Sequence, residues 1–270
     1  YEVVDIIDIE ESLRVAKKYN VFRICHKMKI LVIADIHANY RALKASLDAF
    51  DDVDEVWCLG DIVEYGPMPS ACIDLVRQHC DQVVVGNHDL SFAKCQPQTD
   101  DGWTVWFPHN TTINDLDYLN NLPTLLTLER DGISYCLVHG SPSNHLTGRF
   151  DPYTEEAENR KNLQYSGQDR ILVGHTHMAM RLEIDGKLVA NPGTIGQPRD
   201  GDYRAQCMVI EDGQIQYYRI DYDLDLLAQD YQMSAMNPEQ ADIWLSYTRN
   251  GVVDIHGLQL GPFSPVTYSR

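Results

Sequence analysis

Five segments of this 270-residue sequence carry histidine, aspartate or asparagine residues in groupings that suit metal ligation. They are Asp35-Ile36-His37, Gly60-Asp61, Gly86-Asn87-His88, His139-Gly140 and Gly174-His175-Thr176-His177. Carboxylates, imidazoles and amide oxygens are ligands that suit Mn²⁺, Fe or Zn²⁺, and the absence of cysteine from these segments argues against a closed structural zinc site. One such segment alone would be ordinary turn chemistry. Five together predict a metal centre.

Each of these segments directly follows an apolar run that is typical of a buried β-strand. The runs lie at 29–34, 55–59, 82–85, 133–138 and 171–173. Helical patterns at 41–50 and 70–80 alternate with the first three runs, which predicts βαβ units and a parallel sheet. Because ligand sites gather at the carboxyl ends of strands in open α/β folds, we expect the five loops to converge on one crevice.

The later sequence predicts hairpins and fewer helices. Asp131-Gly132, Asp185-Gly186 and Asp212-Gly213 each separate two strand-like runs, so antiparallel strands are expected in the second sheet. Further helices are expected around 112–121, near 154–165 and at 224–233. The segment 90–122, with Trp103 and Trp106, is irregular and is expected to wall a pocket. After 233 the sequence predicts a weakly patterned tail with a packing or dimerisation role.

In this order the five segments resemble the signature of the calcineurin-like metallophosphoesterase superfamily. Residues 191–196 and 198–201 resemble its small bacterial and archaeal phosphodiesterase-like branch. The resemblance covers residues 28–220, leaving 1–27 as an N-terminal extension outside it and 221–270 as a C-terminal helical segment and tail. It implies an α/β fold, a four-layer α/β/β/α sandwich of two mixed sheets flanked by helices.

The resemblance further implies a site for two divalent transition metal ions, with Mn or Fe favoured over Zn. Seven side chains would hold them: Asp35, His37 and His177 the first ion, Asn87, His139 and His175 the second, and Asp61 both. Two ions ~3.5–4 Å apart bridge a water, lower its pKa towards ~7 and clamp phosphoryl oxygens. The nucleophile would then be a metal-bound hydroxide. A neutral ligand such as Asn87 keeps the site more positive than another carboxylate would.

Two further residues match catalytic positions of the family. His88 would lie beside the metal ions and donate a proton to the leaving oxygen or stabilise the transition state. Glu64 stands where an aspartate orients this histidine in related protein phosphatases, although an ordinary exposed loop glutamate is the alternative. Those phosphatases carry an arginine directly afterwards, whereas this chain has Tyr65-Gly66. This departure weakens an assignment to protein dephosphorylation.

Arginine suits bidentate phosphate binding, so arginines elsewhere in the sequence are candidates for a phosphate clamp. The substrate-binding candidates are Asn87, Arg199 and Arg204. A structural salt bridge is the alternative interpretation for each arginine.

The composition limits partners and location. Lys and Arg number 22 against 40 Asp and Glu, and the resulting formal net charge of −18 repels polyanions. Binding of bulk nucleic acid is therefore disfavoured. No apolar run approaches the ~20 residues that cross a bilayer, and residues 1–28 lack a signal-peptide pattern, so no membrane partner is expected. The seven cysteines lack CxxC spacing, which indicates reduced core residues and a cytoplasmic location.

The sequence thus predicts a metal-dependent hydrolase of small phosphomonoesters or phosphodiesters. A nuclease is one alternative, and the acidic surface counts against it. A non-catalytic protein-binding scaffold of the same fold is another, although such relatives tend to have altered ligands, and here all seven ligand positions and His88 are present. The physiological substrate, the native metal pair and a homo-oligomeric state stay open.

Overall fold

The computed structural model describes residues 27–94, 111–151, 153–251 and 267–269. The expected N-terminal extension, apart from residue 27, lies outside the described residues, as do both tryptophans of the expected pocket wall and residues 252–266 and 270 of the tail. Within the described part of the chain, no helix is long and apolar enough to cross a membrane.

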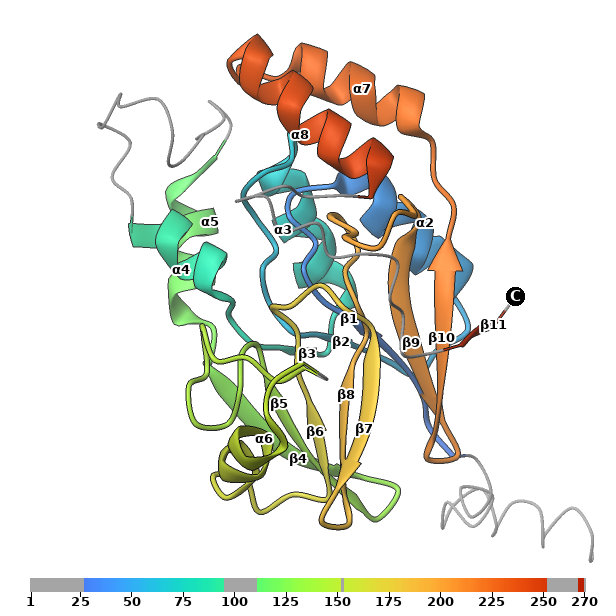
Figure 1. The fold of residues 1–270 in the computed structure, drawn as a ribbon. Helices are drawn as coiled ribbons and strands as arrows, with labels where there is room; N and C mark the ends of the chain where they lie inside the picture. The colour runs from blue at the N-terminus through green and yellow to red at the C-terminus, as the bar shows by residue number, and fades with distance from the viewer. Residues whose placement is uncertain (1–26, 95–110, 152, 252–266, 270) are drawn as a thin grey trace, which may run out of the picture.

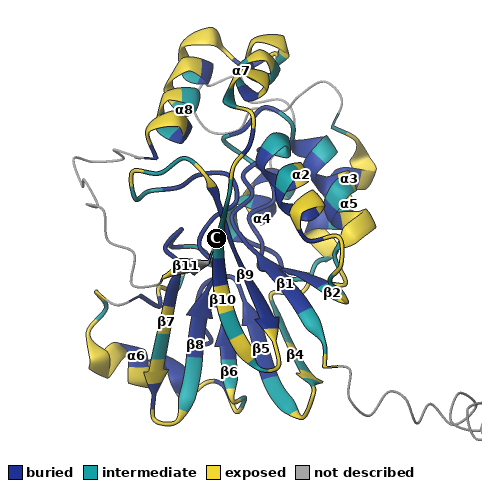
Figure 2. Cartoon of the chain, turned by 90° about the vertical axis from the view of Figure 1, so that its right-hand side faces the viewer, coloured by how far each residue is buried: buried dark blue, intermediate teal, exposed yellow. Residues whose placement is uncertain are grey.

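Two mixed β-sheets lie face to face, with helices on their outer faces (Figures 1 and 2). The first sheet has the order β11 (Tyr268–Ser269), β10 (Gln214–Ile220), β9 (Ala205–Glu211), β1 (Lys29–Ile33), β2 (Glu55–Cys58) and β3 (Gln82–Val83). The second has the order β4 (Leu125–Arg130), β5 (Ile133–Val138), β6 (Arg170–Leu172), β8 (Lys187–Asn191) and β7 (Met180–Ile184). The helices are α2 (Tyr40–Ala49), α3 (Pro69–His79), α4 (Asn87–Lys94), α5 (Ile113–Asn121), α6 (Glu156–Leu163), α7 (Leu224–Met233) and α8 (Pro238–Asn250).

Both sheets combine parallel and antiparallel pairs. β1 runs parallel to β2 and antiparallel to β9, while β5 runs parallel to β6 and antiparallel to β4. The predicted hairpins are present as β4–β5, β7–β8 and β9–β10, and the last of them joins the first sheet and not the second. The four-layer α/β/β/α prediction is confirmed.

Strand β1 shows why the strands are apolar on both faces. Leu31 and Ile33 pack in one cluster with residues of α2, α3 and α7. Ile30 and Val32, which point the other way, pack in a second cluster with Leu137 of the opposite sheet. A third cluster joins the outer face of the second sheet to Leu163 of α6. Alternate residues of each central strand are thus buried in different layers.

The main error of the sequence prediction concerns helix α8, which occupies part of the expected weakly patterned tail. Its boundary signals were present in the sequence. Asn237 caps its first turn by accepting hydrogen bonds from the backbone N–H groups of Glu239 and Gln240, and Pro238 follows the cap. Gly251 ends it in the left-handed conformation that glycine adopts without strain.

Helices α7 and α8 pack against each other, and α7 also packs against α2; the pair lies at the top of Figure 1. Leu227 and Tyr231 of α7 and Ala241 of α8 are buried in the cluster that also contains β1 and α2 residues. This cluster accounts for the packing role that was expected of the C-terminal segment.

Candidate metal centre and active site

The ligand-bearing loops leave their strands in an unusual backbone conformation. Five of the seven predicted ligands have positive φ angles between 48° and 66°: Asp35, His37, Asp61, His175 and His177. Such angles are uncommon for residues with a Cβ atom, and they persist where the surroundings enforce them. Here the backbone N–H groups of Ile36 and His37 both donate to the carbonyl of Asp61, at 2.8 and 2.9 Å. The loops after β1 and β2 therefore hold each other.

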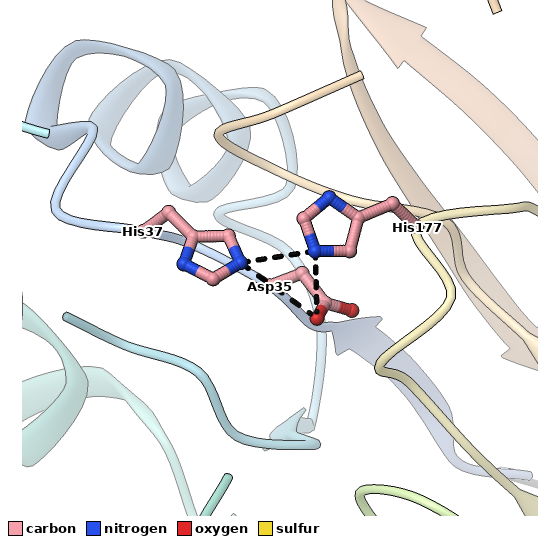
Figure 3. A group of neighbouring side chains, drawn as sticks. All are labelled: Asp35, His37 and His177. Carbon is pink, nitrogen blue, oxygen red and sulfur yellow. Dashed lines mark hydrogen bonds and ion pairs between the residues drawn. The ribbon is translucent and has the colours of Figure 1, made fainter. Parts of the chain in front are cut away.

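The first ligand group consists of Asp35, His37 and His177, which are all buried and point toward one another (Figure 3). The Nε2 atoms of the two histidines lie 3.0 Å apart, and His177 Nε2 lies 3.3 Å from Asp35 Oδ1. Each Nδ1 donates to a backbone carbonyl, that of Val63 for His37 and that of Gln197 for His177. Burial lowers the pKa of both rings, so they are neutral.

The hydrogen-bond pattern of this group fits a cation. Because each neutral ring carries its proton on Nδ1, each Nε2 presents a lone pair to the other. Two facing lone pairs 3.0 Å apart repel each other, and a metal ion is what relieves that repulsion. Burial, together with the charge on Asp61, raises the pKa of Asp35 to about 7, which a bound cation would also reverse.

The second group consists of Asp61, His139 and His175, with Asn87 beside them. His139 Nδ1 donates to the carbonyl of Leu59, and its Nε2 lies 3.1 Å from both Asp61 Oδ2 and Asn87 Oδ1. Burial opposes protonation of His139, but Asp61 outweighs it and raises the pKa to about 10. Burial lowers the pKa of His175 to about 4, so this ring is neutral, as a metal ligand would have to be.

Asp61 joins the two groups. Its Oδ1 accepts a hydrogen bond from the backbone N–H of His88, whereas its buried Oδ2 has no hydrogen-bond partner of acceptable geometry among the described residues. That Oδ2 atom lies 3.9 Å from His37 Nε2 and 3.1 Å from His139 Nε2. Gly86 leaves room for the carboxylate, because a Cβ there would fall 1.9 Å from Oδ1. The carboxylate thus lies close to both groups of candidate ligands.

His88 has one partner that the sequence predicts, Glu64, and one that it does not, Tyr65. Its Nδ1 donates to Glu64 Oε2, and its Nε2 lies 3.1 Å from the hydroxyl of Tyr65. Burial disfavours the charged imidazole, but the hydrogen bond to Glu64 and the charge on Asp61 outweigh it, so the pKa of His88 is raised. The structure therefore brings Glu64 to the atom of His88 that an orienting carboxylate would contact.

The two arginine candidates occupy different environments. Arg199 Nη2 lies 3.4 Å from His177 Nε2 and 3.3 Å from Gln197 Oε1, while its buried Nε has no partner in the described ranges. Arg204 instead donates hydrogen bonds to both carboxylate oxygens of Asp202, and its side chain is 44% exposed. The structure brings Arg199 to the first ligand group and leaves Arg204 in a surface ion pair.

Tyr65 and Trp244 are the residues near the site that the sequence did not single out. The Tyr65 ring centroid lies 4.7 Å from that of His37 and 4.5 Å from that of Trp244 in α8. In the sequence, Tyr65 stands out only as the residue found where related phosphatases have an arginine, and Trp244 lies in α8, which the sequence pattern does not predict. Their contact joins positions 179 apart in the chain, which no local pattern reveals.

An α/β sandwich with two joined groups of metal-ligating side chains at its strand ends has the architecture of a metal-dependent phosphoesterase. The chain belongs to the calcineurin-like phosphoesterase superfamily, whose domain profile matches residues 28–213. The predicted resemblance and the prediction of a phosphoesterase are therefore confirmed.

Known proteins resemble the chain over most of its length. An uncharacterized protein of Methanocaldococcus jannaschii is 29% identical over 226 residues, which cover 73% of this chain and 89% of that protein. A symmetrical bis(5'-nucleosyl)-tetraphosphatase of Chromohalobacter salexigens is 24% identical over 238 residues, covering 83% of this chain and 79% of the enzyme. The crystal structure of a metallophosphoesterase from Sphaerobacter thermophilus has a TM-score of 0.71 at 28% identity, covering 83% of this chain and 100% of that one.

Proposed function

We propose that this protein hydrolyses small phosphomonoesters or phosphodiesters at a site for two divalent metal ions. The observation that carries the proposal is the buried Asp61 carboxylate, whose Oδ2 lies within 4 Å of a histidine Nε2 from each ligand group. A carboxylate in this position suits a ligand that two cations share.

The donor atoms suit Mn or Fe, with Zn as the third choice, because imidazole nitrogens are combined with carboxylate and amide oxygens and no thiolate. Asp35, His37 and His177 would hold one ion and Asn87, His139 and His175 the other, with Asp61 common to both. When bound, two such ions supply an activated water and neutralise charge on the phosphoryl oxygens.

The remaining site residues would bind and protonate the substrate. His88 carries the proton that the leaving oxygen takes up, and Glu64 fixes its ring orientation through Nδ1. We assign the phosphate clamp to Arg199, because its guanidinium lies beside the first ligand group and its Nε is buried without a partner in the described structure. Arg204 is not retained as a clamp, because Asp202 already occupies its donors.

The acidic charge decides between the competing substrates. A net charge of −18 repels long polyanions, so a nuclease remains the second choice, and the substrate is a small ester. A protein-binding scaffold has no need for the buried facing lone pairs of the first ligand group, which are costly without a cation.

The direct test is hydrolysis by protein reconstituted separately with Mn²⁺, Fe²⁺, Zn²⁺ and Mg²⁺. The panel contains p-nitrophenyl phosphate, bis-p-nitrophenyl phosphate, a dinucleoside tetraphosphate and single-stranded DNA. We expect metal-dependent release from at least one small ester, faster than from DNA. Asp61→Asn is the inactive control, which excludes a contaminating phosphatase. Equal rates for wild type and Asp61→Asn on every small ester, or activity confined to DNA, would overturn the proposal.

A further inference from the structure

His88 would contact a substrate through its Nε2 atom, and this atom already lies close to a tyrosine hydroxyl. Glu64 occupies Nδ1, so any oxygen that exchanges a hydrogen bond with this ring must approach Nε2. The hydroxyl of Tyr65 lies 3.1 Å from that atom. An oxygen bound at Nε2 would therefore lie within reach of the Tyr65 hydroxyl as well.

An unusual backbone conformation at residues 64 and 65 places the Tyr65 side chain beside His88. Glu64 and Tyr65 are consecutive residues with φ angles of 68° and 66°, a left-handed pair that is unfavourable for side chains with a Cβ atom. Gly66 then allows the loop to press against the first ligand loop, because a Cβ at this position would fall 2.3 Å from the carbonyl oxygen of His37. Strain of this kind persists only where surrounding contacts enforce it.

Those enforcing contacts include the two C-terminal helices. Tyr231 of α7 donates a hydrogen bond to the backbone carbonyl of Tyr65, at 3.3 Å. Trp244 of α8 packs on the Tyr65 ring at 4.5 Å between centroids, and Tyr247 packs edge-on against Trp244 at 5.6 Å. The Tyr65 ring also contacts His88, at 4.8 Å between centroids. One helix thus holds the backbone of Tyr65 and the other holds its ring.

We propose that Tyr65 is a further substrate-binding residue, whose hydroxyl donates a hydrogen bond to the phosphate-group oxygen that lies against His88 Nε2, with α7 and α8 as the elements that position it. The inference rests on the proposed function. It adds a neutral donor to the site and gives the C-terminal helix pair a role in activity.

Tyr65→Phe is the primary test, because it removes one oxygen atom and keeps the ring that contacts His88 and Trp244. Metal content and Tm should equal those of wild type. The Kd for inorganic phosphate on the Mn²⁺-loaded protein should rise about tenfold, the loss expected for one hydrogen bond, and kcat/KM on p-nitrophenyl phosphate should fall by at least as much. Values within twofold of wild type for both quantities would overturn the inference.

Tyr222→Phe is the matched control. It also removes a phenol hydroxyl, here on a buried tyrosine, but that group is hydrogen-bonded to Asn39 and not to His88. Phosphate binding and kcat/KM should stay at wild-type values in this variant. An equal loss in both variants would assign the effect to general loosening of the fold and would also overturn the inference.

Trp244→Ala tests the helix pair in the same assay. In the wild-type background it should lower kcat/KM, and in the Tyr65→Phe background it should add much less, because both changes act through one hydroxyl. Equal losses in the two backgrounds, together with a lower Tm, would make Trp244 merely structural and would remove the positioning part of the inference.

Phosphate binding keeps this inference separable from the proposed function. Phosphate affinity that depends on Tyr65 in a protein that hydrolyses no ester would refute the function and support the inference. Hydrolysis that is equal in wild type and Tyr65→Phe would refute the inference and leave the function standing. Failure to bind phosphate and to hydrolyse any ester would refute both.

Discussion

Two regions of the molecule reach the candidate site in different ways. The strand-end loops and the first turn of α4 bring every proposed ligand, and buried polar hydrogen bonds hold them: Asp89 alone accepts from the backbone N–H groups of Gly86, Asp61, Ile62 and Val63. The helix pair α7–α8 brings no proposed ligand and reaches the site through Tyr65. In the proposed function, the first region would carry the chemistry and the second would support it.

The energetic character of the two regions differs accordingly. Removing a polar group from the loops leaves buried partners unsatisfied, and each such group costs about 1–3 kcal/mol or more. The helix pair is anchored mainly by apolar side chains such as Leu227 and Ala241, whose contacts tolerate small changes. Substitutions in the loops should therefore abolish function, whereas substitutions in the helix pair should tune it.

The largest effect is expected at the shared carboxylate. Asp61→Asn should reduce the Mn²⁺ content from about two ions per chain to less than one, because the neutral amide attracts two cations less strongly. The kcat/KM should fall by more than ~10³-fold, since metal ions contribute several kcal/mol to transition-state stabilisation. Elemental analysis and initial rates measure both quantities. The exposed Asp48→Asn provides the control, and retention of two ions by Asp61→Asn would contradict the shared-ligand assignment.

The next effect separates chemistry from metal binding within the loops. His88→Ala should keep both ions yet lose turnover by ~10²–10⁴-fold, the range for a general acid. The deficit should shrink on nitrophenyl esters relative to alkyl esters, because a weakly basic leaving oxygen needs less protonation. His79→Ala, at an exposed position of α3, should behave as wild type. A deficit that is the same for both leaving groups would remove the general-acid role.

The loops were more predictable from the sequence than the helix pair for a physical reason. Each motif is continuous and follows a short strand, so its position at a carboxyl strand end depends on local pattern alone. Helix α8 buries Ala241 and Thr248 but leaves Ile243 exposed, so it lacks the clear apolar stripe that signals a helix. Its cap residues were readable, but its contact with Tyr65 depends on the tertiary fold.

The arginines show the same limit within one loop. Arg199 and Arg204 lie five residues apart and are equivalent candidates by residue type. The neighbouring Asp202 takes the donors of Arg204, while the loop directs Arg199 toward His177. Only side-chain placement distinguishes them, because a salt bridge and a phosphate clamp have the same sequence signature.

A smaller effect is therefore expected at Arg199. Arg199→Lys keeps the charge but loses the planar fork, and should weaken transition-state binding by ~1.5–3 kcal/mol, or about 10- to 150-fold in kcat/KM. Arg204→Lys should change kcat/KM by less than about twofold, because its ion pair is on the surface. If Arg199 is only structural, Arg199→Ala will lower Tm while the specific activity of the folded fraction is unchanged.

The smallest effect is expected in the helix pair, at Tyr231. Tyr231→Phe removes the hydrogen bond from α7 to the Tyr65 carbonyl and leaves the buried ring in place. Because one neutral hydrogen bond contributes about 1 kcal/mol, Tm should fall by about 2–4 °C and kcat/KM by no more than about fivefold. The Mn²⁺ content should be that of wild type, since no ligand is touched.

Tyr247→Phe is the control for Tyr231→Phe, because it removes a phenol hydroxyl from α8 while keeping the ring that packs on Trp244. It should leave kcat/KM at the wild-type value. Thermal melting, elemental analysis and steady-state kinetics on one preparation decide the outcome. A loss of metal in Tyr231→Phe, or a fall in kcat/KM as large as that of Arg199→Lys, would show that α7 contributes directly to metal binding or catalysis. The two regions would then not differ in role. A small fall without metal loss is what a supporting region requires, because strain stored in the loop relaxes only partly when one of its enforcing contacts is removed.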